Sequence, residues 1–175
     1  SIVRENFPTN IRLQSIEKKG ASNFNAILSL YALRGAKDWF HNSRVKNQAD
    51  FGKKAKLDVD HIFPRSIYSD EEYNDSILNK ILLTTTTNIK KSNKDPSKVL
   101  SNTLSKNFGN NKKELLSTLQ THFINDNAYD ALLDDNHQKF LLEREDELLK
   151  EIAKRIGVKY TSKFNDPTET SPNTP

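Results

Sequence analysis

The sequence of 175 residues contains no cysteine, which excludes disulfide bonds and thiolate-bound metal centres. Its five glycines lie far apart, so the chain has no glycine-rich loop of the kind that holds nucleotide phosphates. No apolar run reaches the roughly 18–20 residues that a membrane-spanning helix needs. The first residues, Ser1 to Arg4, do not have the composition of a signal peptide. We therefore expect a cytoplasmic protein that does not span a membrane and is held together by packing.

Methionine is also absent, including the initiator, so we expect the chain to be a fragment or a processed product that lacks an N-terminal domain or partner subunit. Hydrophobic residues make up 34% of the chain and charged residues 29%, which is typical of a polar globular protein. We predict a connecting segment at 1–21 and one domain at 22–160. The proline, serine and threonine content of 161–175 predicts a disordered tail.

The net charge of +4 is unevenly distributed along the chain. Residues 1–56 hold 11 Lys or Arg against 4 Asp or Glu, whereas residues 126–157 hold 5 against 9. A basic N-terminal part and an acidic C-terminal part suit a DNA backbone that approaches the protein from one side. An ordinary solvated surface explains so small a total equally well, and both interpretations stay open.

The most informative stretch runs from Leu57 to Lys98. Residues 57–63 are rich in valine, isoleucine and phenylalanine and stop at a proline, and residues 76–85 form a second apolar, β-branched run. Residues 86–94 lack glycine and proline and begin with threonines that can cap a helix. The pattern predicts a hairpin around a loop at 64–75, followed by a helix. This is the outline of a ββα-metal unit.

Polar residues at the ends of these elements suit hydrolysis of a phosphodiester. The carboxylate of Asp60 and the amide oxygen of Asn88 are hard ligands suited to Mg²⁺. His61 has an ordinary pKa near neutrality and can take a proton from an attacking water. Lys91 follows Asn88 by three positions, so it shares a helical face and can neutralise a phosphate. Asp60 and His61 alternate in a strand and face opposite ways, so both reach one site only if the strand bends or ends there.

The stretch resembles the HNH nuclease motif, through DVDHIFPRS and then ILNKILLTTTTNIKKSNKDPS. It is similar to the HNH domain of CRISPR RNA-guided effectors, and more similar to the C-terminal nuclease half of GmrSD-type (type IV) modification-dependent restriction proteins. Looser likeness to the latter continues through the segments at 32–40, 122–124 and 140–144. The third position of the motif is Asn88 rather than the histidine of the founding motif, which favours Mg²⁺ or Mn²⁺.

The resemblance implies roles for residues of the motif. It implies Asp60 and Asn88 as metal ligands, His61 as general base, and Asn79 as the residue that ties the loop and orients the site. Lys91 matches a frequent lysine of the family. Nucleic-acid contacts are expected for three basic residues near the motif: Arg65, Lys90 and Lys94. For Arg65, a surface salt bridge to the acidic segment at 69–72 is the alternative.

We therefore expect an α+β fold, a mostly helical domain around a ββα-metal core at about 57–95. The expected function is that of a metal-dependent DNA endonuclease in prokaryotic defence against phage or modified DNA. The alternative is a catalytically inactive module that binds nucleic acid or regulates a larger defence protein. The motif does not indicate the target sequence or the oligomeric state.

Overall fold

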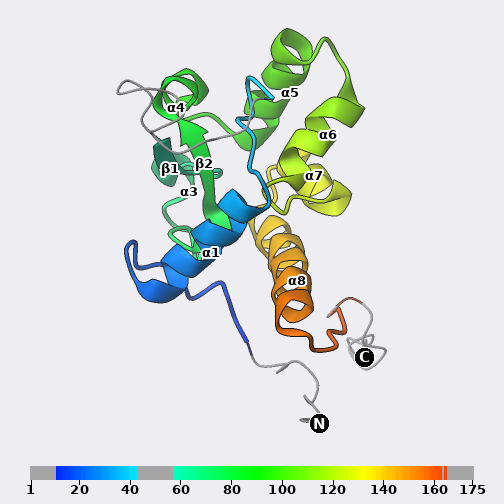
Figure 1. Cartoon of the computed structure of the whole chain (residues 1–175). Coiled ribbons are helices and arrows are strands. Elements are labelled where there is room, and N and C mark those ends of the chain that lie inside the picture. Colours follow the sequence, from blue (N-terminus) through cyan, green and yellow to red (C-terminus); the bar gives the residue numbers. More distant parts are fainter. Residues whose placement is uncertain (1–10, 43–56, 163, 165–175) are drawn as a thin grey trace, which may run out of the picture.

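The computed structural model describes residues 11–42, 57–162 and 164, and Figure 1 shows the arrangement of their elements. Residues 1–10 of the expected connection at 1–21 lie outside these residues, as does most of the expected tail at 161–175. The elements in chain order are α1 (Ser22–Leu33), β1 (Leu57–His61), α3 (Arg65–Tyr68), the 3-10 turn η1 (Ile77–Asn79), β2 (Lys80–Thr84), α4 (Thr85–Lys91), α5 (Pro96–Asn107), α6 (Lys112–Gln120), α7 (Asp126–Leu133) and α8 (His137–Ile156).

The two strands form an antiparallel hairpin in which Asp60 pairs with Ile81 and His61 with Lys80. Both strands are shorter than the apolar runs suggest. After His61 one more backbone hydrogen bond follows, in which the Asn79 carbonyl accepts from the Ile62 N–H at 2.9 Å. The first half of the second run is wound into η1 rather than extended. The loop expected at 64–75 contains the short helix α3.

Helix α4 follows β2 directly and packs on the hairpin (Figure 1). The Thr84 hydroxyl accepts from the Thr87 N–H at 3.2 Å, so a threonine does cap this helix. The helix ends at Lys91, three residues earlier than expected, because Ser92 has a φ of 55° and leaves the helical conformation. Its early end leaves Lys90 and Lys91 in the last turn.

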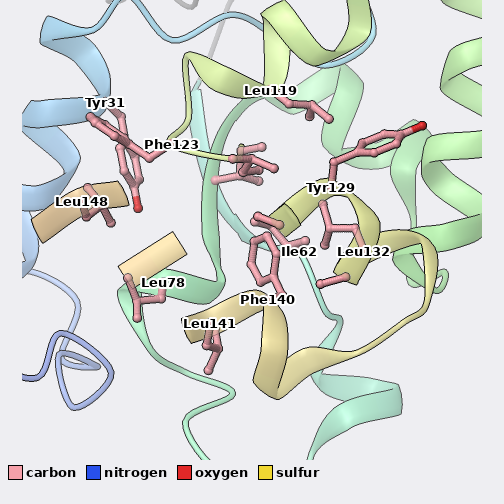
Figure 2. Close-up of a cluster of buried hydrophobic side chains, with 14 of the residues drawn as sticks. Tyr31, Ile62, Leu78, Leu119, Phe123, Tyr129, Leu132, Phe140, Leu141 and Leu148 are labelled. Carbon is pink, nitrogen blue, oxygen red and sulfur yellow. The ribbon is translucent and has the colours of Figure 1, made fainter. Parts of the chain in front are cut away.

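The helices bury a shared core with the hairpin, as Figure 2 shows. Tyr31 of α1, Leu119 of α6, Tyr129 and Leu132 of α7, and Phe140, Leu141 and Leu148 of α8 all contribute to it. Ile62 and Leu78 bring the ends of the hairpin region into the same cluster. Each such side chain contributes about 1.5–3 kcal/mol when it is fully buried. The hairpin therefore depends on the helices for its own stability.

Arg144 joins α8 to the hairpin from inside this core. Its guanidinium is fully buried and donates to the carbonyls of Leu78 and Lys80, each at 2.7 Å. A third hydrogen bond reaches the His122 carbonyl at 3.0 Å, and the group lies 4.9 Å from the centre of the Tyr31 ring. Backbone carbonyls and an aromatic face thus replace the carboxylate that usually accompanies a buried arginine. The contact fixes the start of β2 relative to the last helix.

The fold is α+β and mostly helical around a small two-stranded sheet, which confirms the predicted class. Among the helices of residues 11–42 and 57–162, none combines the length and the apolar character that crossing a membrane requires.

Candidate active site

One face of β1 turns toward α4. Asp58 and Asp60 are two residues apart on this face, and Asn88 and Lys91 are one helical turn apart on α4. The Asn88 amide donates to Asp58 Oδ2 at 3.2 Å, and Lys91 Nζ lies 2.7 Å from Asp60 Oδ2. The strand and the helix are therefore joined by two parallel side-chain pairs. The predicted ligands Asp60 and Asn88 are both members of this array.

Lys91 is held deep in the structure. Its side chain is 3% exposed, and its ammonium also donates to the His61 carbonyl at 2.9 Å. A buried ammonium with two oxygen partners is fixed in place, and removal of one partner would leave it uncompensated. Lys91 thus sets the position of Asp60 relative to His61. In this arrangement its charge is directed at Asp60 and not at the surface.

The other face of β1 carries the His61 imidazole. Its Nε2 lies 2.8 Å from Asp75 Oδ1, and Lys80 Nζ contacts the same nitrogen and Asp75 Oδ1. One nitrogen cannot donate to a carboxylate and accept from an ammonium at the same time, so these contacts define two protonation arrangements. When Nε2 donates to Asp75, Nδ1 keeps a lone pair that can accept a proton. Asp75 therefore favours the tautomer that a general base requires.

Burial lowers the pKa of His61 below its ordinary value, and the Lys80 ammonium acts in the same direction. The hydrogen bond with Asp75 opposes this change in the pKa of His61. For Asp75 itself, the hydrogen bond from His61 is the largest cause of a lowered pKa. Burial also lowers the pKa of Lys80. The site therefore keeps an unprotonated imidazole beside an ionised carboxylate near neutral pH.

Asn79 lies beneath the site with its side chain fully buried. Its Oδ1 accepts from the Phe63 N–H at 2.8 Å, while its Nδ2 donates to the carbonyls of Phe63 at 3.0 Å and Asn74 at 2.8 Å. These bonds close the loop that carries Asp75 against the residues after β1. The same geometry keeps the Asn79 side chain away from solvent.

A buried carboxylate outside the motif anchors α4. Asp38, 1% exposed, accepts from the Thr84 N–H at 3.1 Å and from the hydroxyls of Thr84 at 3.0 Å and Thr87 at 2.8 Å. It thereby connects the segment after α1 to the first turn of α4. A carboxylate in this place also complements the positive end of the helix. Asp38 is one of the residues that our sequence reasoning missed.

Asp75 and Lys80 were missed for a related reason. Asp75 lies in the polar loop, and nothing in its spacing distinguishes it from Asp70 or Glu71. Lys80 is the cross-strand partner of His61, so a correct register of the hairpin is the signal that could have found it. The loop folds back through α3 and η1, and this brings Asp75 to the imidazole.

The three basic residues expected to touch nucleic acid lie in different surroundings. Arg65 is 71% exposed, and its Nη1 lies 3.6 Å from Asp75 Oδ2, so it contacts the site but not the acidic segment at 69–72. Lys90 and Lys94 are exposed on and just beyond the last turn of α4. Within the described part of the chain neither lysine forms an ion pair. Both remain available to an anion.

The donor chemistry of the α4 face fits a hard divalent cation. Two carboxylates and one amide, those of Asp58, Asp60 and Asn88, are gathered there, and Mg²⁺ takes few protein oxygens and keeps several waters. Across residues 11–42 and 57–162 there is no cluster of three or more His, Cys, Asp or Glu that could hold a metal.

Comparison with known proteins supports an HNH nuclease. Residues 47–97 match the family described as HNH endonuclease, which includes both strands and α4. The match supports a nuclease, and so a hydrolase, as the class to which this segment is similar.

A longer similarity extends beyond the motif. The uncharacterized protein MJ0686 of Methanocaldococcus jannaschii is 26% identical over 166 residues, which cover 83% of this chain and 27% of that protein. The chain thus spans about a quarter of the length of this relative. No solved structure matches the chain.

Proposed function

We propose that the chain is a metal-dependent DNA endonuclease domain in which His61 is the general base and Asp60 and Asn88 hold a divalent ion. One observation supports this most strongly. Within the segment that matches HNH endonucleases, β1 ends at His61, the point at which adjacent Asp60 and His61 can serve one site, and each side chain is held there by a charged partner. Phosphodiester hydrolysis needs both groups around one scissile phosphate.

The residues of the chain would act as follows. His61 takes a proton from a water at Nδ1, while Asp75 receives the Nε2 hydrogen bond and stabilises the imidazolium that forms. Lys91 keeps Asp60 in place, and Asn79 holds the loop that supplies Asp75. A bound Mg²⁺ or Mn²⁺ would supply electrostatic stabilisation for the departing oxygen. Products with 5′-phosphate and 3′-hydroxyl ends are the outcome that the resemblance implies.

A plasmid assay tests this proposal. The native chain, His61→Ala and His41→Ala would be incubated with supercoiled plasmid and Mg²⁺ or Mn²⁺, with EDTA added to a parallel set. His41 is an exposed histidine outside the site and is the matched control. We expect nicked or linear plasmid from the native chain and from His41→Ala. Loss of a general base costs a factor of about 10²–10⁴, so the His61→Ala variant should be near background.

A result in which His61→Ala cuts as fast as the native chain would exclude His61 as the base. Absence of cutting by the native chain would favour the inactive module. One observation already gives that alternative some support, because the Lys91 ammonium pairs with the Asp60 carboxylate that an ion would use. Addition of the remaining part of the full protein would then show whether a partner domain is needed for cutting.

We also propose that the full protein acts in prokaryotic defence against phage or modified DNA. The resemblance to GmrSD-type proteins supports this role, and the short coverage of the relative leaves room for a domain that selects the DNA. Phage plating on cells that express the full protein, compared with the same protein carrying His61→Ala, would test the role. Equal plaque numbers for both proteins would contradict it.

A further inference from the structure

A cavity of about 280 Å³ lies between α4 and α5, beside the candidate active site. Among the described residues, its lining includes four lysines (Lys90, Lys91, Lys94 and Lys106) and two asparagines (Asn102 and Asn107), with no acidic residue. Three of the lysines are exposed, and Lys91 is the buried lysine that pairs with Asp60. The cavity therefore shares one side chain with the site where cleavage is proposed.

The charge around this cavity is one-sided. Residues 84–107 hold five lysines and a single acidic residue, Asp95. That carboxylate is already engaged by Lys98 and by the Tyr68 hydroxyl. Within the described residues, Lys90, Lys94 and Lys106 have no carboxylate partner. Lysines from two helices that converge without a counterion favour a bound anion.

A buried hydroxyl gives an independent indication of a ligand. Thr103 lines the cavity, is 1% exposed, and its Oγ1 has no hydrogen-bond partner among the described residues. An unpartnered hydroxyl in the interior is unfavourable unless a ligand or water satisfies it. Lysine ammoniums and a hydroxyl are all donors that suit phosphate.

We infer that this cavity binds a backbone phosphate of the DNA strand, at a position next to the phosphate that is cut. The inference rests on the proposed function and adds a binding site to it. Lys90 and Lys94 come from the α4 end, while Lys106 and Thr103 come from α5. Contacts from two helices to one segment of the DNA backbone would fix the position of the DNA strand relative to His61 and Asp60. The contact is independent of base sequence, because phosphates carry no base information.

Binding of a fluorescein-labelled 20-base-pair duplex, followed by anisotropy in EDTA so that no strand is cut, tests the site. The variant is the full chain with Lys94→Glu and Lys106→Glu. Each lost phosphate contact reduces the slope of log affinity against log salt by about 0.9. We expect the double variant to bind at least about tenfold more weakly at low salt, with a slope smaller by about 0.9 because one phosphate contact is lost. Conversion to Lys94→Arg and Lys106→Arg should retain binding.

The matched control is Lys113→Glu with Lys139→Glu, which changes the net charge equally at exposed lysines outside the cavity. Thermal melting of every variant shows that it is folded. An equal loss of affinity in both double variants would overturn the inference, because net charge alone would then explain binding. Native-like affinity and slope in Lys94→Glu with Lys106→Glu would overturn it as well.

The same proteins separate this inference from the proposed function. If the native chain binds DNA through these lysines but does not cut plasmid, the proposed phosphate site is supported and the nuclease proposal fails for the isolated chain. If the native chain cuts and the Lys94→Glu, Lys106→Glu variant binds and cuts normally, the nuclease proposal is supported and the proposed phosphate site is wrong. A native chain that neither binds nor cuts overturns both.

Discussion

At the scale of single residues, the contact between His61 and Asp75 has the clearest chemical consequence. A general base must hold an unprotonated nitrogen toward the water and stabilise the charge it acquires. In the proposed mechanism Asp75 would do both for His61 through one hydrogen bond of 2.8 Å to Nε2. Lys80 opposes this effect of Asp75, because an ammonium next to Nε2 disfavours the imidazolium. Arg65 and Lys80 in turn keep Asp75 ionised. Asp75 is therefore a positioning residue in this arrangement.

We predict that Asp75→Asn keeps the loop folded but slows cleavage about tenfold or more, because a neutral amide stabilises the imidazolium less. The loss should appear in kcat with little change in KM, since the proposed mechanism gives Asp75 a contact with His61 and none with the substrate. Steady-state cleavage of a short duplex with Mg²⁺ measures both parameters. The control is Asp70→Asn, an exposed carboxylate of the same loop that should leave kcat unchanged. An unchanged kcat in Asp75→Asn would show that the contact has no role in catalysis.

At the scale of elements, the hairpin and α4 are tied together by side chains more than by backbone. Asn79 satisfies three buried backbone groups between the end of β1 and the loop. Asp38 holds the first turn of α4, and Arg144 holds the start of β2. A short two-stranded hairpin is at best marginally stable alone, so these polar anchors define its position.

We predict that Asn79→Ala lowers the free energy of unfolding by about 2–4 kcal/mol, because it leaves several buried backbone groups without partners. Urea denaturation followed by circular dichroism measures the change. The matched control is Asn25→Ala, which removes an exposed amide bonded to the Gly20 carbonyl at 3.2 Å. The control should change the stability by less than about 0.5 kcal/mol. A loss below about 1 kcal/mol in Asn79→Ala would contradict the anchoring role.

At the scale of the whole molecule, the core contains a histidine that links stability to pH. His122 is fully buried, donates from Nε2 to the Lys37 carbonyl at 2.7 Å, and packs against the Tyr31 ring. Burial lowers the pKa of His122 to about 3. In the unfolded chain a histidine takes up a proton near pH 6.5. Between these values the unfolded state binds more protons, so acid favours unfolding.

We predict that the contribution of His122 to stability is complete above about pH 6.5 and falls by about 1.4 kcal/mol per pH unit on acidification. Between pH 6.5 and 4.5 this single group should remove about 2 kcal/mol. His122→Gln keeps an amide donor for Lys37 but cannot titrate, so its stability should be lower at neutral pH and less dependent on acid. Urea unfolding at several pH values measures both quantities. An acid slope identical to that of the native chain would contradict the prediction.

The sequence alone was sufficient for the α+β class and for the strand–loop–strand–helix order. These depend on local periodicity and on short-range rules such as the threonine cap of α4. It also indicated the residues of the nuclease motif, since their spacing lies within one stretch of chain.

Only the tertiary structure decided which side chains meet around that motif. Asp75 reaches His61 through the folding of an irregular loop, and Asp38 reaches Thr84 from 46 residues earlier in the chain. Lys106 and Lys94 converge because α4 and α5 enclose a cavity between them. Such contacts depend on how elements pack, and no local pattern of residue types records them. The motif therefore supports a class of chemistry, while packing determines which residues surround the motif.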